Sequence, residues 1–388
     1  MTIIYIFLLI CMLAVLYQSG RVIAKTNRIK SRAGAAAILV YTLNEGLRYG
    51  RGIDYNYYGH DYEMFELYGE SIQNIGFVTF EKLCIWIGLP WQGCVMIMSF
   101  VFIVGLLNLL KEYGRALPIA LPWFALISLF FVENMVKWYL AFSVFMIALV
   151  FMIRGGNKWQ RKYFSVSIAA CLIHYAFLPI PIAFYIVYRW KRIALSPKFS
   201  IPLFFVIGLT FQTSAMLHFV DLANMVTTLS ENYEHYGNDI DYWLTSGNDG
   251  ASRSSFPGIT EIFTICLLLC YGYKVIRRFE QPYIYAYNLF VIGVLLLPVA
   301  NQIELAGRYI LLFYHFMAIV FASIFCGKEI NSRPLLLFIF LMMFISMGRR
   351  NLTDPLFDNA QKYLYVWNSQ GRTYDSMLNV WKTGNEKK

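Results

Sequence analysis

Two arginines and an aspartate lie close together in a segment that reads LRYGRGIDYNYY. Arg48 and Arg51 are three residues apart, and Asp54 follows three residues later. Two guanidinium groups can clamp a phosphate or diphosphate, and a neighbouring carboxylate can accept a proton from a hydroxyl. Gly50 and Gly52 would let the backbone approach a ligand. The pattern predicts an anion site with a general base. The alternative is an interfacial loop with its arginines at headgroup level.

Aromatic and charged residues elsewhere extend this candidate site. Tyr55 and Tyr58 follow the aspartate and could stack on sugar rings. Lys137 lies four residues after Glu133, a spacing that suits a local ion pair, although Lys137 could equally contribute to a phosphate site. Glu45, one helical turn before the first arginine, is interpreted as an internal partner that orients it.

A third group of candidates opens a late apolar segment. Glu304 and Arg308 are again four residues apart, and Tyr309 follows directly. Polar groups are costly in apolar surroundings and mark functional positions by default. The alternative is that Arg308 only extends its charged end toward the membrane interface.

His174 lies in the stretch CLIHYAFLPIP. In a broken membrane helix such a histidine would line a cavity, because irregular backbone at that depth must be buried in protein or wet. The alternative, given equal weight, is a buried histidine that has only a structural role and whose hydrogen bonds are made within the protein. The sequence contains no P-loop, no dinucleotide-binding glycine motif and no nucleophile elbow. Since no His, Cys or acid cluster has metal-ligand spacing either, we expect no metal and no cofactor.

The composition defines the class of protein that must position these groups. Of 388 residues, 58% are hydrophobic and only 14% are charged, against about 25% charged in an average soluble domain. This excludes a soluble globular enzyme and a disordered chain, and predicts an all-α polytopic membrane protein. The net charge of +10 belongs to cytoplasmic loops of such a protein, so we expect no nucleic-acid partner.

Apolar runs predict the spans. The stretch 163–188 begins and ends at basic clusters, so we expect a re-entrant or crossing hairpin broken near Pro179 and Pro181. Residues 76–90 suit an interfacial amphipathic helix. Counting the hairpin as two, the chain would cross or enter the membrane about twelve times. The other spans are 2–18, 33–47, 91–110, 116–132, 138–153, 200–220, 258–273, 283–300, 309–326 and 334–347.

The distribution of lysine and arginine predicts the orientation. The segment after the first span is wholly basic and should be cytoplasmic. Residues 48–75 and 221–257 are acidic and are expected to form two large outer loops. The chain is therefore expected to form one transmembrane domain, 1–348, and a tail, 349–388. Span parity places that tail outside, whereas its seven basic residues favour the inside.

The ordered set of these residues resembles the EpsG family of Wzy-type polymerases, which make bacterial capsule, exopolysaccharide and O-antigen. The first segment is similar to the family's R-x-G-x-G-[T]-D-Y-x-x-Y signature, His174 to its H-x-[S/A] element, and Arg308 with Tyr314 to its R-x-x-x-Y element. Three departures stand out. Ile53 replaces a common Thr, the element at 74–77 lacks a carboxylate, and Lys137 replaces a common Arg, which keeps the charge but loses the planar fork.

The resemblance implies a fold similar to membrane (C-type) glycosyltransferases, in the bacterial inner membrane with the site facing the periplasm. It implies transfer of oligosaccharide chains from undecaprenyl diphosphate to the next lipid-linked repeat unit, without a metal. Membrane lipids would be partners, and binding of a chain-length regulator stays open. Asp54 is the first choice for the base and His174 the second. Diphosphate contacts would come from Arg48, Arg51, Lys137 and Arg308, and sugar contacts from Tyr55, Tyr58, Glu304 and Tyr309.

Two other functions remain as alternatives. A flippase for lipid-linked oligosaccharides would also need basic residues and many spans, but its cations usually line a central cavity along several helices. A glycosyltransferase that uses a polyprenyl-monophosphate sugar commonly carries an acidic pair after the first span, where this chain is basic. The concentration of charged residues at outer span ends favours the polymerase.

Overall fold

The computed structural model describes residues 2–71, 73–212, 255–302, 304–327, 330, 332–353, 365–368 and 374. This part of the chain is helical and contains no β-strand, apart from one isolated bridge between Arg48 and Tyr365. The chain forms two compact units. The first comprises Met1–Arg189, Phe321–Gly327 and Met347–Lys388, and the second Trp190–Val320 and Lys328–Ser346.

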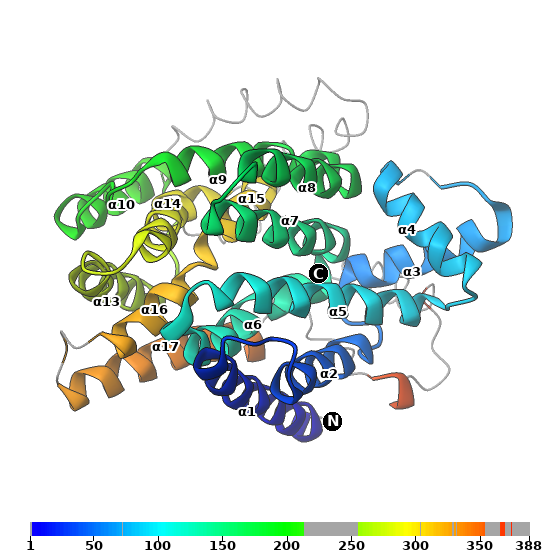
Figure 1. Cartoon of the computed structure of the whole chain (residues 1–388), viewed down its shortest axis with the longest axis horizontal. Helices are drawn as coiled ribbons and strands as arrows, with labels where there is room; N and C mark the ends of the chain where they lie inside the picture. Colours follow the sequence, from blue (N-terminus) through cyan, green and yellow to red (C-terminus); the bar gives the residue numbers. More distant parts are fainter. Residues whose placement is uncertain are drawn as a thin grey trace. The chain divides into compact units, whose positions relative to one another are not determined.

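A series of packed helices builds the first unit. Within it α1 lies beside α2 and α6, α2 beside α5, α5 beside α7, and α7 beside α8 (Figure 1). Gly105 lets α5 and α7 approach closely, because a Cβ there would lie 2.7 Å from the Ser143 carbonyl oxygen. Small residues at helix contacts are typical of membrane proteins. The bounds are α1 Thr2–Thr26, α2 Arg32–Gly46, α3 Ile53–Tyr68, α4 Ile75–Trp86, α5 Trp91–Lys111, α6 Leu117–Asn134, α7 Val136–Arg154, α8 Trp159–Ile173 and α9 Pro179–Arg189.

The second unit contains α10, Pro197–Gln212, packed against α13, Ile259–Ile276, and α14, Gln281–Gln302. The backbone of α15, Glu304–Tyr314, packs directly on α14 at Gly293. A Cβ at this glycine would lie 2.5 Å from the Tyr314 nitrogen. Two helices contribute residues to both units: α16, Met317–Cys326, and α17, Arg333–Thr353.

Each of the ten single spans predicted from apolar runs coincides with helix, although residues 213–220 lie outside the described part. The span 309–326 corresponds to two helices, α15 and α16, separated near His315. In the described part of the chain, 6 helices are long and apolar enough to cross a membrane. The protein is therefore an all-helical, multi-pass membrane protein. The count of twelve passes stays a prediction.

The predicted break in the 163–188 stretch is confirmed. Helix α8 ends at Ile173, a short turn follows, and α9 begins at Pro179. Proline is tolerated in the first turn of a helix, where its missing N–H has no partner to lose. The two helices run antiparallel, since the Tyr163 hydroxyl donates to the Pro181 carbonyl over 2.6 Å and the Tyr163 ring contacts Tyr185.

The segment 48–75 was expected to be an outer loop, but most of it is α3. Tyr55, Tyr62 and Phe65 are buried on one face of this helix, and Gly69 ends it in a left-handed conformation. The segment was predicted as a loop because it has no long apolar stretch. Its tyrosine rings nevertheless form the buried face of an amphipathic helix. The predicted helix within 76–90 is present as α4. The other predicted loop, 221–257, lies almost entirely outside the described residues.

Candidate functional site

Glycines shape the segment between α2 and α3 that carries the two arginines. Gly50 and Gly52 have φ values of 64° and 93°, which side-chain-bearing residues rarely adopt. A Cβ at Gly52 would lie 2.7 Å from the Glu133 carbonyl oxygen. The close approach predicted for Gly52 is therefore made to the end of α6 within the protein.

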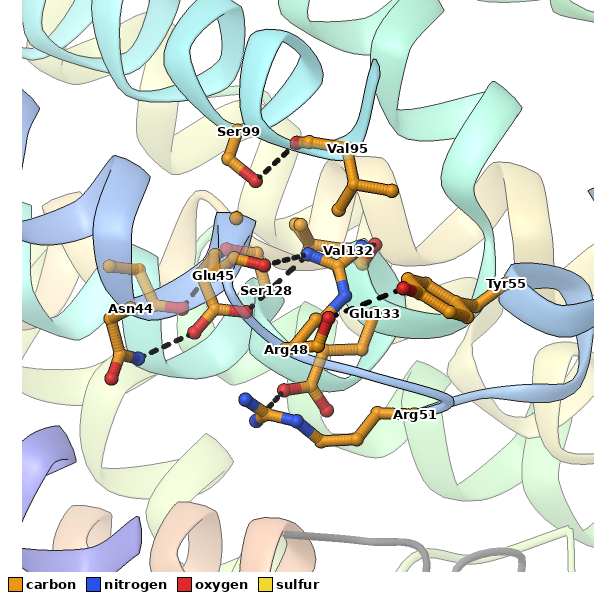
Figure 2. Close-up of polar contacts among 12 residues, drawn as sticks. Asn44, Glu45, Arg48, Arg51, Tyr55, Val95, Ser99, Ser128, Val132 and Glu133 are labelled. Carbon is orange, nitrogen blue, oxygen red and sulfur yellow. Dashed lines mark hydrogen bonds and ion pairs between the residues drawn. The ribbon is translucent and has the colours of Figure 1, made fainter. Parts of the chain in front are cut away.

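Arg48 is held in the interior by groups from the end of α2 and from α6. Only 2% of it is exposed. Its Nη1 donates to the Glu45 carbonyl over 2.8 Å, and its Nη2 donates to the Val132 carbonyl over 3.2 Å (Figure 2). The Glu45 carboxylate lies 3.8 Å away and accepts a hydrogen bond from Asn44. The predicted contact between Glu45 and Arg48 is present.

Arg51 is fully buried and pairs with a residue far away in sequence. Its Nη1 lies 2.6 Å from Glu133 Oε1, as Figure 2 shows. Burial lowers the pKa of Arg51, but Glu133 and Glu45 raise it more, so the net pKa lies above the ordinary value and the group stays charged. Within the described residues, Arg51 Nε and Nη2 and Arg48 Nε make no hydrogen bond. These N–H groups are buried donors beside the Glu133 carboxylate.

The described part of the tail covers this arginine–glutamate network. Val366 donates its N–H to the Leu47 carbonyl over 3.0 Å, and the Tyr365 ring lies 4.7 Å from the Arg51 guanidinium. Burial raises the pKa of Tyr365 to about 12. The described tail residues therefore lie at the same end of α2 as the arginines, and the side of the membrane on which this end lies stays a prediction. Sequence analysis gave the tail no role, since no motif signals it.

The candidate base and the candidate sugar-stacking rings occupy α3. Asp54 lies in its first turn and is half-buried, and its backbone N–H donates to Asn134 Oδ1 over 3.4 Å. Tyr55 is fully buried, and its hydroxyl donates to Gln92 Oε1 over 2.8 Å. That burial leaves no open ring face for a sugar. Tyr58 is only half-buried.

Lys137, at the start of α7, belongs to a separate polar cluster. Its Nζ donates to Gln73 Oε1 over 2.7 Å, and Gln73 in turn donates to Asp61 over 3.0 Å. The ammonium lies 5.4 Å from the Tyr58 ring centroid, within range of a cation–π contact. Glu81 of α4 is fully buried, and Phe77, one turn earlier on this helix, has its ring centroid 5.9 Å from the Lys137 ammonium. Glu81 lies within residues 76–90, which the sequence predicted only as an interfacial helix without a role in the site.

His174 lies at the break between α8 and α9, in extended backbone. Its ring packs edge-on against Trp138, with centroids 5.0 Å apart. Because Trp138 follows Lys137, this contact places His174 beside the start of α7. Helix α4 also reaches this break, since a Cβ at Gly76 would lie 2.6 Å from the Leu172 carbonyl carbon.

The remaining predicted residues belong to the second unit. Arg308 and Tyr309 are half-buried on α15, and the side chain of Glu304 lies outside the described part. On the same helix, the Tyr314 hydroxyl donates to Glu261 over 2.8 Å. The first unit therefore brings together Arg48, Arg51 and Asp54, with Lys137 and His174 along the adjoining α7, whereas Arg308 and Tyr309 form a second group.

Comparison with known proteins identifies one family. The family model described as EpsG matches residues 33–365. This range covers both groups of candidate residues and Tyr365. No curated protein and no solved structure matches the chain.

Proposed function

The chain belongs to the EpsG family, a family of Wzy-like polysaccharide polymerases, and from this premise we propose its specific reaction. The protein transfers an oligosaccharide chain from undecaprenyl diphosphate to the next lipid-linked repeat unit, at the outer face of the bacterial inner membrane. The single observation that carries this proposal is the buried arginine–glutamate network with its unused N–H donors.

In the proposed reaction, a hydroxyl oxygen of the acceptor sugar attacks the anomeric carbon of the donor. A new glycosidic bond forms, and the bond from that carbon to the diphosphate oxygen breaks. The electron pair leaves with the diphosphate, and the hydroxyl proton passes to a carboxylate. Asp54 is the first candidate for this base because it lies three residues after Arg51, at the start of α3. His174 is the second.

Arg48 and Arg51 would stabilise the negative charge that develops on the leaving diphosphate. Fixed donors in a water-poor site act strongly on developing charge because they need no reorganisation. Arg48 Nε and Arg51 Nε and Nη2 supply such donors. Tyr365 lies against the Arg51 guanidinium, so access of a diphosphate would require this contact to open.

Each unit carries residues that we propose as substrate contacts. Tyr58 would support a sugar ring in the first unit, whereas Tyr55 would position Arg48, because the Tyr55 ring lies 5.7 Å from that guanidinium. In the second unit Arg308 would bind diphosphate, and Glu304 and Tyr309 would bind sugar.

The test uses a host deleted for this gene and complemented with plasmids. Surface polysaccharide would be separated on a gel after complementation with wild type, Arg48→Ala, Arg308→Ala or the control Arg21→Ala, which alters an exposed arginine of α1. We expect a ladder with wild type and Arg21→Ala, and only core plus one repeat with the other two. Loss of even the single repeat would indicate a flippase. A ladder unchanged by the deletion would contradict the proposal.

A further inference from the structure

Glu81 is a buried carboxyl group that the proposed reaction does not use. It lies on α4 between Phe77 and Cys84, on the face turned toward the core of the first unit. None of its surface is exposed. In the part of the chain that the structure describes, neither carboxyl oxygen has a hydrogen-bond partner.

Burial of a carboxyl group in this way destabilises the folded state. Burying a polar group without a hydrogen bond costs free energy, and the large majority of buried polar atoms in native proteins have a partner. Burial, with Asp61, raises the pKa of Glu81 to about 8, while Lys137 acts in the opposite direction. Near neutral pH the carboxyl is therefore largely protonated, and it can both donate and accept a hydrogen bond.

The surroundings of Glu81 indicate the chemical class of the missing partner. Lys137 already donates to Gln73, which donates to Asp61. The cluster thus offers an ammonium, an amide and two carboxyl groups. One cation beside two acids does not favour a diphosphate. It suits a neutral ligand with several hydroxyl groups, each able to donate and to accept.

Aromatic rings complete this chemistry. Tyr58 and Phe77 pack together with centroids 5.5 Å apart, and the Lys137 ammonium lies over both rings. The half-buried Tyr58 ring can supply apolar contact for the C–H groups of a sugar, while polar groups beside it fix the hydroxyls. Phe77 is fully buried and supports the Tyr58 ring. Asp61, Gln73 and Tyr58 are the half-buried members of the cluster, and access of a sugar to the fully buried Glu81 would require these side chains to move apart.

We propose that Glu81, Asp61, Gln73 and Lys137 form a subsite that binds hydroxyl groups of one sugar of the oligosaccharide substrate. This inference rests on the proposed function, because the sugar is part of the lipid-linked substrate. It moves Lys137 from the diphosphate contacts to the sugar contacts. The α6–α7 junction joins the two sites, since Glu133 pairs with Arg51 and Lys137 follows four residues later.

The test measures binding by purified full-length protein in detergent. The first probe is the oligosaccharide released by mild acid from the host's lipid-linked repeat unit, and the second is undecaprenyl diphosphate. Calorimetric titration would compare wild type, Glu81→Gln, Glu81→Leu and the control Glu66→Gln, which alters an exposed carboxylate of α3. We expect Glu81→Leu to bind the oligosaccharide at least tenfold more weakly, and Glu81→Gln to lose less affinity because its amide still donates and accepts hydrogen bonds. Binding of undecaprenyl diphosphate should change less than twofold in both variants.

Thermal unfolding of the same samples separates binding from folding. Removal of an unsatisfied buried carboxyl should leave the folded state as stable or more stable. Wild-type oligosaccharide affinity in Glu81→Gln and Glu81→Leu would overturn the subsite. An equal loss in Glu66→Gln would overturn it as well. Failure of the polymerase proposal would look different: wild type itself would bind neither probe, and the surface ladder would survive deletion of the gene.

Discussion

The arginine–glutamate network and the Lys137 cluster both lie at the α6–α7 junction, but they handle buried charge in opposite ways. In the network, Arg51 pairs directly with Glu133 at 2.6 Å, and Arg48 lies beside Glu45. In the Lys137 cluster, the Glu81 carboxyl has no hydrogen bond from any described residue. We propose that this difference reflects two functions. The paired arginines hold rigid N–H donors for a diphosphate, and the unsatisfied Glu81 carboxyl binds a sugar hydroxyl.

The largest expected effect comes from breaking the network. Arg51→Ala should destabilise the protein by about 3–5 kcal/mol, because it removes one charge of the buried Arg51–Glu133 ion pair. Thermal unfolding in detergent would measure this. The double variant Arg51→Met with Glu133→Leu should recover much of that stability, because it removes both charges, yet it should not restore polymerisation. Recovery of both would show that the network is purely structural.

A pH series would sharpen the contrast at Glu81. Its folded pKa is raised to about 8 from an ordinary 4.5, so between these values the folded state binds more protons than the unfolded state. Stability should therefore fall as pH rises through this window, by up to about 1.4 kcal/mol per unit of pKa shift. Glu81→Gln should flatten the dependence. Equal slopes in wild type and Glu81→Gln would show that burial and Asp61 do not raise the pKa of Glu81.

A smaller effect is expected from the backbone that carries Arg51. Gly52→Ala should cost about 1–3 kcal/mol, because φ is positive there and the added methyl would meet α6. Gly69→Ala is the matched control, with a similar φ of 76° and no neighbouring atom within 4 Å. Unfolding midpoints of the two variants would separate strain from contact. If Gly69→Ala lowered stability as much as Gly52→Ala, the close approach of Gly52 to α6 would contribute nothing to the effect.

The smallest effect should come from the tail. Tyr365→Phe removes the hydroxyl that donates to Asn44 Oδ1 over 3.2 Å and should cost about 0.5–1.5 kcal/mol. The ring over Arg51 is retained, so the surface ladder should persist. Chemical unfolding would measure the loss. A collapse of the ladder would mean that the hydroxyl itself takes part in the reaction.

Sequence analysis located most helices but few of the contacts between them. Apolar runs predicted the spans, because burial in lipid or protein acts on each segment separately. The Glu45–Arg48 contact could also be predicted from the sequence, since the two residues lie one helical turn apart. The Arg51–Glu133 pair spans 82 positions, and only the packed fold brings them together. Helix α3 was not predicted, because tyrosines rather than aliphatic residues fill its buried face. The burial of Glu81 was not predicted either, because the residues around it come from other helices.

The central claim is that the network serves a diphosphate-leaving glycosyl transfer. The most direct measurement reconstitutes purified protein in liposomes with the host's lipid-linked repeat unit as the only substrate, and follows chain length on a gel together with release of undecaprenyl diphosphate. We predict longer chains and one diphosphate released per added repeat with wild type, and neither product with the folded Arg51→Met, Glu133→Leu double variant. Chains made at the wild-type rate by that variant, or no elongation by wild type, would contradict the account.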